Sequence, residues 1–400
     1  MALLQIESKH AAEHTLPLLR LGFRPFFLLA GISAVCFILY WLYLLNGGAA
    51  ATAYAAVSWH AHEMLFGYTV AVIAGFLLTA EKNWTNLQTA QGLWLAILAL
   101  LWLAGRIAPW LMLPAWLVAL IDLSFLPLLA LVLLRPLLKT SQYQHLIFVV
   151  ILLVLFVADL LFHLGNLNSA WKISALGIRL AWLTIVFLIT VMGGRVIPFF
   201  IERGTGSLRK VHQSRRIDII GFITLLAWIV ATLIAPGHVY VAYLAGIAGI
   251  LQLLRCWGWH LAALWRVPML WILYLGYAWI PIGLFLYAYA VFTAGTVSPA
   301  LHAFTAGTIG MLTLGMMARV SLGHTGRAIE SSPLLVTAFV LVTCGALLRV
   351  LGPLLLVHQL QIPYLTIITG AGLLWALAFF LFVIGYVPIL MQARVDGRPG

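Results

Sequence analysis

The sequence predicts an all-α fold, a polytopic membrane helix bundle with about twelve transmembrane helices. Hydrophobic residues make up 64% of the 400 residues, charged residues make up 8%, and the mean hydropathy is +1.09. An ordinary soluble domain has about a quarter of its residues charged. The apolar residues form continuous runs of about 20 residues, long enough for a helix to cross a hydrocarbon core. Because these runs do not alternate with polar residues, we expect helices and not the strands of a barrel.

The predicted helices follow one another with short polar connections. We expect them over residues 25–46, 58–80, 90–105, 112–134, 145–165, 175–200, 217–235, 239–255, 268–292, 301–320, 334–357 and 364–392. The whole chain, 1–400, is therefore predicted to be a single membrane domain, with tails over 1–24 and 393–400. The longest polar connection, around residues 201–216, is too short for an extramembrane catalytic domain.

Basic residues predict the orientation of the bundle. If the N-terminus is cytoplasmic, 18 lysines and arginines fall on the cytoplasmic side and only Arg106, Lys172, Arg179 and Arg349 fall toward the outside. Such a bias is typical of cytoplasmic loops, so both termini are predicted to be cytoplasmic. The same distribution accounts for the net charge of +12 without a nucleic-acid partner. The densest basic segment, 203–216, is expected to contact anionic lipid.

Histidines gather at the predicted outer ends of three helices. His60 and His62 begin the second helix, His163 ends the fifth, and His302 begins the tenth. Imidazole is a common ligand of haem, copper and zinc, and an ionisable group at membrane depth is costly unless it is paired or ligating. The alternative is that these rings occupy the membrane interface and have no ligand role. The three cysteines are isolated from one another, so a thiolate metal site is disfavoured.

The start of the second helix carries the strongest candidates. His60 and His62 point about 200° apart on a regular helix, so they are expected to serve different partners. One would be an axial haem ligand, while the other would bind a second metal or hydrogen-bond a haem propionate. Small residues follow in this helix and in the tenth, and they either allow close helix packing or seat a flat macrocycle. They are Gly67, Ala71, Gly75, Ala303, Ala306, Gly307 and Gly310.

Asp159 and His163 lie four residues apart on the fifth predicted helix, which places them on one face and within reach of each other. A carboxylate commonly orients a ligating imidazole, although a polar pair can also simply pack helices together. Arg179, near the outer end of the sixth helix, is a candidate partner for haem propionates or for Asp159. His324, near the inner face, marks a less supported second metal site.

Five segments carry a resemblance to a known family. They are FRPFFLLAG at 23–31, WHAHEMLFGY at 59–68, AGFLLTAEKNWT at 74–85, GGRVIPFF at 193–200 and HAFTAGTIGMLTLGMMARVSLGHTGR at 302–327. Together they resemble the NnrS family over essentially the full length. The resemblance implies a protein of the bacterial cytoplasmic membrane, linked to the response to nitric oxide and containing haem and copper. It transfers these cofactors, with His60, His62, His163, His302 and His324 as candidate ligands.

A looser similarity links the chain to the haem-copper oxidases and nitric oxide reductases, which share twelve helices and have haem-ligating histidines on the second and tenth. The chain departs from them because its seventh helix has no adjacent histidine pair, its sixth has no histidine, and its tenth begins with one histidine instead of two. Copper ligands would therefore have to come from elsewhere, such as His163 with His60 or His62.

These observations predict a membrane haem and copper protein that binds nitric oxide, with its reduction as a further activity. Reduction would need protons, for which Glu63 and Asp159 are candidate relays. It would also need an electron donor, which stays unknown because no CxxCH motif of a cytochrome c occurs. The main alternative is a copper or haem transporter using the same histidines. A gas sensor that signals through the segment 203–216 is a third hypothesis.

Overall fold

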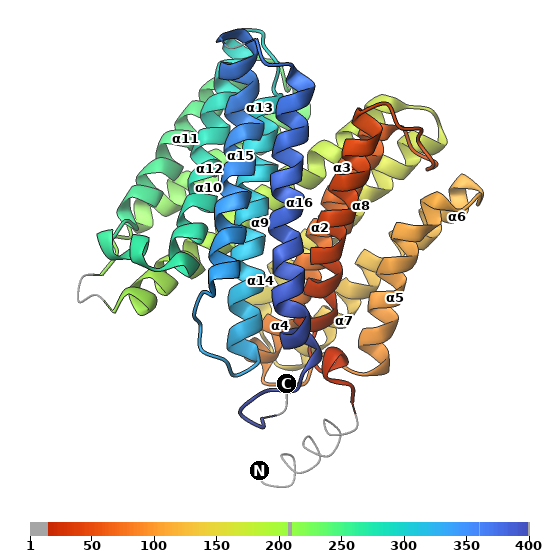
Figure 1. Cartoon of the computed structure of the whole chain (residues 1–400), viewed down its shortest axis with the longest axis vertical. Coiled ribbons are helices and arrows are strands. Elements are labelled where there is room, and N and C mark those ends of the chain that lie inside the picture. The colour runs from red at the N-terminus through yellow and green to blue at the C-terminus, as the bar shows by residue number, and fades with distance from the viewer. Residues whose placement is uncertain (1–14, 207–209, 360, 399–400) are drawn as a thin grey trace. The chain divides into compact units, whose positions relative to one another are not determined.

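The computed structural model describes residues 15–206, 210–359 and 361–398, and side chains are described for all of these except 356–359. Twelve helical spans in this part of the chain are long and apolar enough to cross a membrane. No strand occurs among the described residues (Figure 1). The predicted all-α membrane bundle is therefore confirmed.

Each span overlaps the predicted one, including the short third span, and the ends differ by up to five residues. The first four are α2 (Phe23–Leu45), then α3 (Ala56–His62) with η2 (Glu63–Thr69) and α4 (Val70–Thr85), then α5 (Leu93–Ile107) with η3 (Ala108–Trp110), then α6 (Ala115–Leu123) with α7 (Phe125–Lys139). The next five are α8 (Leu146–Leu167) preceded by η4 (Tyr143–His145), α9 (Trp171–Thr205), α10 (Arg215–Ile234), α11 (Val239–Gly258) and α12 (Pro268–Phe292). The last three are α13 (Ser298–His302) with η6 (Ala303–Ile309) and α14 (Gly310–His324), then α15 (Pro333–Gln359) and α16 (Tyr364–Met391).

Local chemistry sets the ends of these helices. Asn86 adopts a left-handed conformation with φ of 54° and ends α4, a role that asparagine fills with little strain. The Ser214 hydroxyl accepts a hydrogen bond from the Ile217 N–H at 3.5 Å and begins α10. Pro268 opens α12, where its missing N–H has no intrahelical partner to lose.

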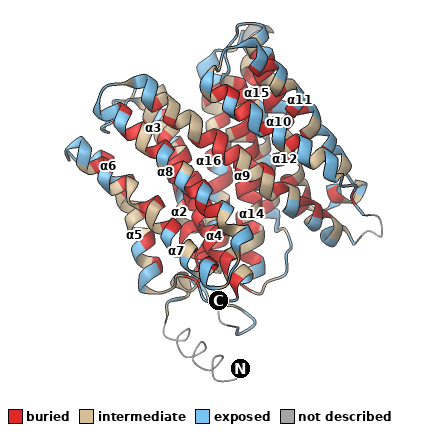
Figure 2. Ribbon diagram, turned by 180° about the vertical axis from the view of Figure 1, so that it is seen from behind, coloured by how far each residue is buried: buried red, intermediate tan, exposed pale blue. Residues whose placement is uncertain are grey.

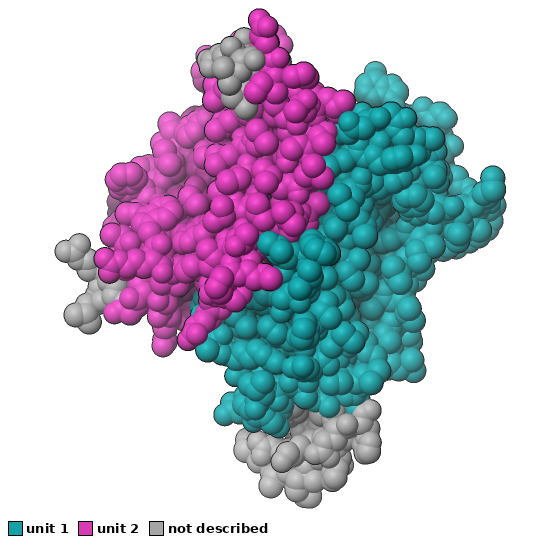
Figure 3. Space-filling view, viewed as in Figure 1, with its two compact units in different colours: residues 1–181, 317–329, 379–400 teal, residues 182–316, 330–378 magenta. Residues whose placement is uncertain are grey.

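The chain divides into two compact units, which Figure 3 colours separately. Unit 1 takes its described residues from 1–181, 317–329 and 379–400, and unit 2 from 182–316 and 330–378. Three of the four boundaries fall within α9, α14 and α16, so each of these helices contributes residues to both units, and the fourth falls between Ile329 and Glu330.

The core of unit 1 is built on the packing of α2 against α4. Phe23, Phe26 and Phe27 are fully buried, and Gly75 of α4 lies against the rings of Phe26 and Phe27. In a membrane such contacts stabilise the bundle through van der Waals packing, because small residues let a neighbouring helix approach closely. Most residues of α4 are buried (Figure 2).

The arginine of the FRPFF segment, Arg24, has a structural role at the start of α2. Its side chain is fully buried, and its Nη1 donates to the main-chain carbonyls of Leu390 at 2.9 Å and Gln392 at 2.6 Å. These carbonyls lie at the end of α16, where the last four of a helix have no intrahelical partner. The guanidinium therefore ties the start of α2 to the end of α16 within unit 1.

Replacing Arg24 with leucine is expected to lower the free energy of unfolding by about 2 to 4 kcal/mol, because the carbonyls at the end of α16 lose their charged donor. A thermal-unfolding measurement on the detergent-purified protein would show the loss. Arg398→Leu is a suitable control, because the Arg398 side chain is 80% exposed and should leave the melting temperature unchanged. Equal melting temperatures for the two variants would contradict this role of Arg24.

Unit 2 contains a buried polar network that accounts for part of the GGRVIPFF segment. The Arg255 guanidinium donates to Asp218 at 2.6 Å, Gln252 at 2.8 Å and the Tyr277 hydroxyl at 2.6 Å. A Cβ on Gly194 would collide with this guanidinium, and one on Gly193 would meet the Tyr277 ring at 2.9 Å. The two glycines therefore let α9 lie directly against the network.

Candidate metal centre

A π-helical segment interrupts the second membrane span directly after His62. The α-helix α3 ends at His62, the π-helix η2 covers Glu63–Thr69, and α4 then resumes the α-helix. The Thr69 hydroxyl accordingly donates to the Met64 carbonyl, five residues back, while Thr79 in regular helix bonds the carbonyl four residues back. Single-turn π-helices within α-helices are frequent at functional sites. The change from α-helix to π-helix falls between His62 and Glu63, which makes these two residues candidates for a functional site.

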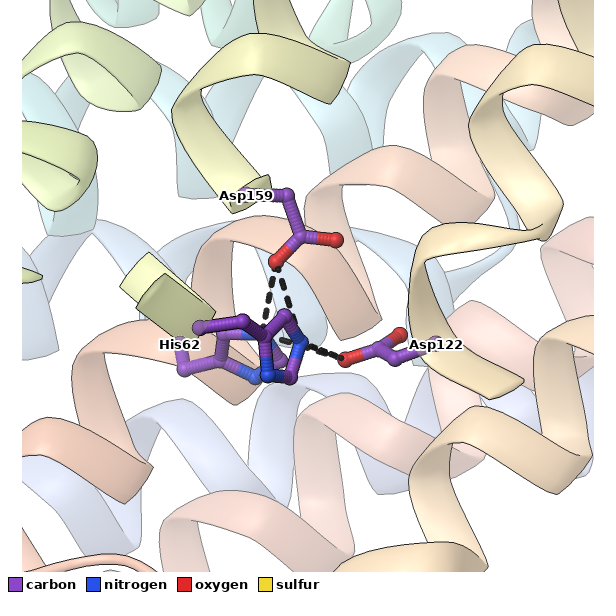
Figure 4. A group of neighbouring side chains, drawn as sticks. His62, Asp122 and Asp159 are labelled. Atoms are coloured by element: carbon purple, nitrogen blue, oxygen red, sulfur yellow. Dashed lines mark hydrogen bonds and ion pairs between the residues drawn. The ribbon is translucent and has the colours of Figure 1, made fainter. Parts of the chain in front are cut away.

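His62 is the centre of a group of buried side chains in unit 1. Its Nε2 lies 3.0 Å from Asp159 Oδ1 and 3.2 Å from Asp122 Oδ2. The Nε2 of His163 lies 3.2 Å from the same Asp122 oxygen and 3.6 Å from the same Asp159 oxygen. Figure 4 shows the two aspartates approaching His62 from different sides. Two imidazole nitrogens and two carboxylate oxygens therefore converge on one point.

These four atoms have the spacing of a metal site. They come from α3, α6 and α8, and all lie within 4.8 Å of one another. Ligands bound at about 2.0 to 2.1 Å in tetrahedral geometry would be separated by roughly 3.3 Å. The four nitrogen-to-oxygen distances, 3.0, 3.2, 3.2 and 3.6 Å, lie around that value. The group can hold a metal ion with little rearrangement.

Two further charged residues surround the four donors. Glu63 Oε1 lies 3.1 Å from the second ring nitrogen of His62, Nδ1, so this carboxylate orients the imidazole. Arg106 of α5 donates to both oxygens of Glu63 at 3.1 Å and also to Asp122. A carboxylate on the remote nitrogen of a ligating histidine is a common support of metal centres.

Charge gives a second argument for a cation at this point. All six side chains are at most 6% exposed. Three carboxylates, those of Glu63, Asp122 and Asp159, face one guanidinium, which leaves a net charge of −2 when both imidazoles are neutral. Uncompensated buried charge is strongly unfavourable. A divalent cation among the four donors would neutralise it.

Aromatic residues close the site against water. The Phe162 ring stacks on His62 with centroids 4.3 Å apart, and Tyr54 packs against both histidines. Tyr54, Trp59 and Phe162 belong to one buried apolar cluster. Tyr54 precedes the membrane span, and burial raises the pKa of its phenol, so it remains neutral beside the carboxylates. Exclusion of water strengthens electrostatic interactions inside the site.

The donor set defines the kind of metal. Two imidazoles with two carboxylates suit borderline or hard divalent ions such as Zn²⁺, Fe²⁺ or Cu²⁺, while Cu(I) prefers thiolate and thioether ligands. Haem does not fit at His62, because both ring nitrogens face carboxylates and Phe162 covers a ring face. The surroundings of His62 therefore fit an ion and not a macrocycle.

Replacing Glu63 with glutamine is expected to weaken divalent-metal affinity by about 10 to 100-fold, because His62 loses the carboxylate that orients it. The four donor atoms remain, so binding should not be abolished. Competition titration with a chelator would measure the change. Glu330→Gln serves as the control, since Glu330 is exposed and lies in unit 2. Unchanged affinity in the Glu63 variant would remove Glu63 from the site.

The structure brings together His62, His163, Asp159 and Glu63 of the predicted site residues. His60 lies elsewhere, as its angular separation from His62 predicts, because its ring stacks on Trp41 with centroids 4.4 Å apart. A proton-relay role for Glu63 and Asp159 stays a prediction.

Two other predicted residues lie apart from this group. His324 ends α14, its ring packs 5.8 Å from that of Phe23, and its carbonyl accepts from Arg394. Arg179 is half-buried on α9, while the ion pairs of Asp159 among the described residues are with His62 and His163. Contact of Arg179 with haem propionates stays a prediction.

Asp122 and Arg106 are site residues that the sequence does not predict. Asp122 is the single charged residue in its apolar run of residues 112–134. An acid at membrane depth marks a functional site by default, so this isolation is the feature of the sequence that points to Asp122. The charge bias of the loops places Arg106 only on the outer side. Its isolation after an apolar run carries the same signal.

The structure shows a second π-helix in unit 2 with the same local construction. The α-helix α13 ends at His302, the π-helix η6 covers Ala303–Ile309, and α14 follows. In both spans the histidine is followed by glycine after five residues and again after thirteen, at Gly67 and Gly75 and at Gly307 and Gly315. His302 Nδ1 donates to the Ser298 carbonyl at 2.8 Å, which fixes the ring and its tautomer.

The small residues of these spans are occupied by aromatic neighbours. Gly307 lies against Trp279, and Gly310 lies against Trp375, both within unit 2. Gly75 holds the Phe26 and Phe27 rings in unit 1. On these faces the glycines allow close helix packing, which is one of the two roles expected for them from the sequence, the other being contact with a haem macrocycle.

Comparison with known proteins agrees with this architecture. A family model described as "NnrS protein" matches residues 17–394. The chain belongs to the NnrS family. No curated protein matches the chain. The matched range contains every residue of the centre, so the His62 group and both π-helices lie within the NnrS region of this membrane protein.

Proposed function

We propose that this NnrS protein is a metalloprotein of the bacterial cytoplasmic membrane that binds nitric oxide as part of a nitrosative-stress response, with both termini cytoplasmic. The observation that carries the proposal is the convergence of His62, Asp122, Asp159 and His163 on one buried point. The charge bias of the loops supports the orientation. The family membership supports the link to nitric oxide.

Copper is the metal that we assign to this centre. Two imidazoles and two carboxylates suit Cu²⁺, and the net charge of −2 matches a divalent ion. When bound, copper supplies a redox-active position at which nitric oxide can bind. The protein side chains hold the ion, exclude water through Tyr54 and Phe162, and orient His62 through Glu63.

Haem is assigned to His302 in unit 2. Among the described residues, histidines, cysteines and acids gather with the spacing of a metal site only at the centre in unit 1, so His302 would act as a single protein ligand. A single oriented imidazole suits haem, because the macrocycle supplies four ligands of its own. Ser298, whose carbonyl orients His302, also contacts Arg349, because the Arg349 Nη2 donates to the Ser298 hydroxyl at 3.3 Å. Arg349 would donate to a haem propionate.

A copper transporter is the principal alternative, with the same donors forming a passage site. The donor set argues against transport of Cu(I), since its four donors are imidazole nitrogens and carboxylate oxygens and not sulfur. The enclosure of all four donors, none more than 5% exposed, also favours a retained ion over a passing one. Retention or passage of the metal is therefore the property that separates the two functions.

The test combines metal analysis with absorption spectra of the detergent-purified protein, with and without nitric oxide. Wild-type protein should contain copper and haem, and nitric oxide should shift its spectrum. His62→Ala should lose copper and keep the haem spectrum, while His302→Ala should do the reverse. His145→Ala is the control, because the His145 ring stacks on Trp84 outside both groups.

Two outcomes would reject the proposal. A protein that copurifies with neither metal and carries copper across vesicle membranes would be a transporter. A protein whose spectrum and metal content are unchanged in both variants would have its cofactors elsewhere. Production of nitrous oxide from nitric oxide, with an added electron donor, would extend the proposed binding to catalysis.

A further inference from the structure

Glu81 is a buried acid that the metal centre does not use. It lies on α4, one turn before that helix ends at Thr85, and its side chain is 0% exposed. Neither carboxylate oxygen has a hydrogen-bond partner among the described residues. The nearby Thr85 hydroxyl bonds the main-chain carbonyl of Glu81, not its side chain. The carboxyl group is therefore buried without a hydrogen-bond partner from any described residue.

Basic residues occur at the same end of unit 1 but do not pair with Glu81. Among the helices that pack against α4, α2 and α7 carry Arg24, Arg135 and Lys139 at this end, and Lys82 is the next residue of α4 itself. His324 and Arg394 also lie near Lys82 at this end. The Arg24 guanidinium donates to carbonyls of α16. No ion pair with Glu81 occurs in the part of the chain that the structure describes.

A buried carboxylate without partners is too unfavourable to remain ionised in a membrane interior. A metal ion would not relieve this, because hard cations require several oxygen ligands and Glu81 offers the oxygens of a single carboxyl. A proton removes the charge without requiring a further ligand. We propose that Glu81 is a proton-binding site of unit 1, which takes up and releases its proton at the predicted cytoplasmic end of the bundle.

Glu81 lies on the same membrane span as two residues of the metal centre. Both occupy the continuous span Ala56–Thr85, with His62 and Glu63 near one end and Glu81 near the other. Glu81 follows Glu63 by eighteen positions in the span, at most about 27 Å along the axis, which is the length that a regular α-helix would give. The span thus carries a metal ligand on the predicted outer side and a protonatable acid on the predicted inner side.

The test uses infrared spectra of the full-length protein as purified, because the proposal does not depend on which metal the protein holds. A protonated carboxylic acid in an apolar environment gives a carbonyl band separate from those of carboxylates. We expect wild-type protein to show this band near neutral pH, to lose it at alkaline pH, and to shift it in D₂O. Glu81→Gln should lack the band, and Glu330→Gln, at an exposed position, should retain it.

Stability provides an independent measurement. Glu81→Gln keeps the shape of a neutral carboxyl, so it should fold at least as stably as wild type, and Glu81→Asp should retain a carboxylic acid band. Identical spectra for wild type and Glu81→Gln, or a band that does not shift in D₂O, would overturn the proposal. A Glu81→Gln variant that fails to fold while Glu81→Asp folds without the band would also overturn it, because Glu81 would then act as a paired carboxylate.

Discussion

His62→Ala is expected to weaken divalent-metal binding in unit 1 by more than about 100-fold. Loss of an outer partner of a metal ligand already costs about 10 to 100-fold, and His62 supplies a ligand atom itself. The variant also removes one of the two imidazoles that contact Asp122 and Asp159. Metal content after dialysis, measured by mass spectrometry, and competition titration would both report the loss.

His60→Ala is the matched control for this experiment. His60 lies two residues from His62 on the same short helix, but its ring stacks on Trp41 outside the group of donors. It should keep wild-type metal affinity, apart from a small loss of stability. Equal metal loss in the two variants would mean that the start of the helix has unfolded, and equal retention would show that His62 is not a ligand.

The difference between these two histidines could be predicted from the sequence, because residues two positions apart on a helix point in different directions. The pairing of Asp159 with His163 was predictable on the same ground, since residues four apart share a face. Both are consequences of regular helix geometry within one segment. The twelve spans were likewise predictable, because each is a continuous apolar run.

The other half of the site could not be derived in this way. Asp122 and Arg106 lie on α6 and α5, and only tertiary packing of these helices brings them to His62 and Glu63. Sequence spacing carries no information on contacts between separate helices. An isolated charge in an apolar run does mark each residue as unusual, so their importance was visible even though their partners were not.

The π-helices show a different limit. The spacing of histidine and glycine is the same at His62 and His302, but three matching residues in each span are too few to predict an unusual helix. A π-helix is held by carbonyls and donors from neighbouring helices as well as its own. In unit 1 the Gly67 carbonyl accepts from Trp102 Nε1 of α5 at 3.2 Å. This contact, like that of Asp122, arises only in the folded bundle.

Arg106→Met is expected to destabilise the metal-free protein by about 3 to 5 kcal/mol, the usual cost of removing one partner of a buried ion pair. The guanidinium is the single cation that contacts both Glu63 and Asp122 among the described residues. Without it the net charge of the group becomes −3 with neutral imidazoles. Thermal unfolding in detergent would measure the effect, and Arg135→Met, at an exposed position on α7, is the control.

A second substitution separates electrostatics from packing. Glu63→Gln combined with Arg106→Met removes one negative charge along with the positive one and returns the group to −2, so it should recover part of the lost stability. Added divalent metal should stabilise the Arg106 variant as well, because a cation then replaces the missing charge. If neither the second substitution nor the metal restores stability, Arg106 acts by filling space, and the charge argument for a cation at His62 fails with it.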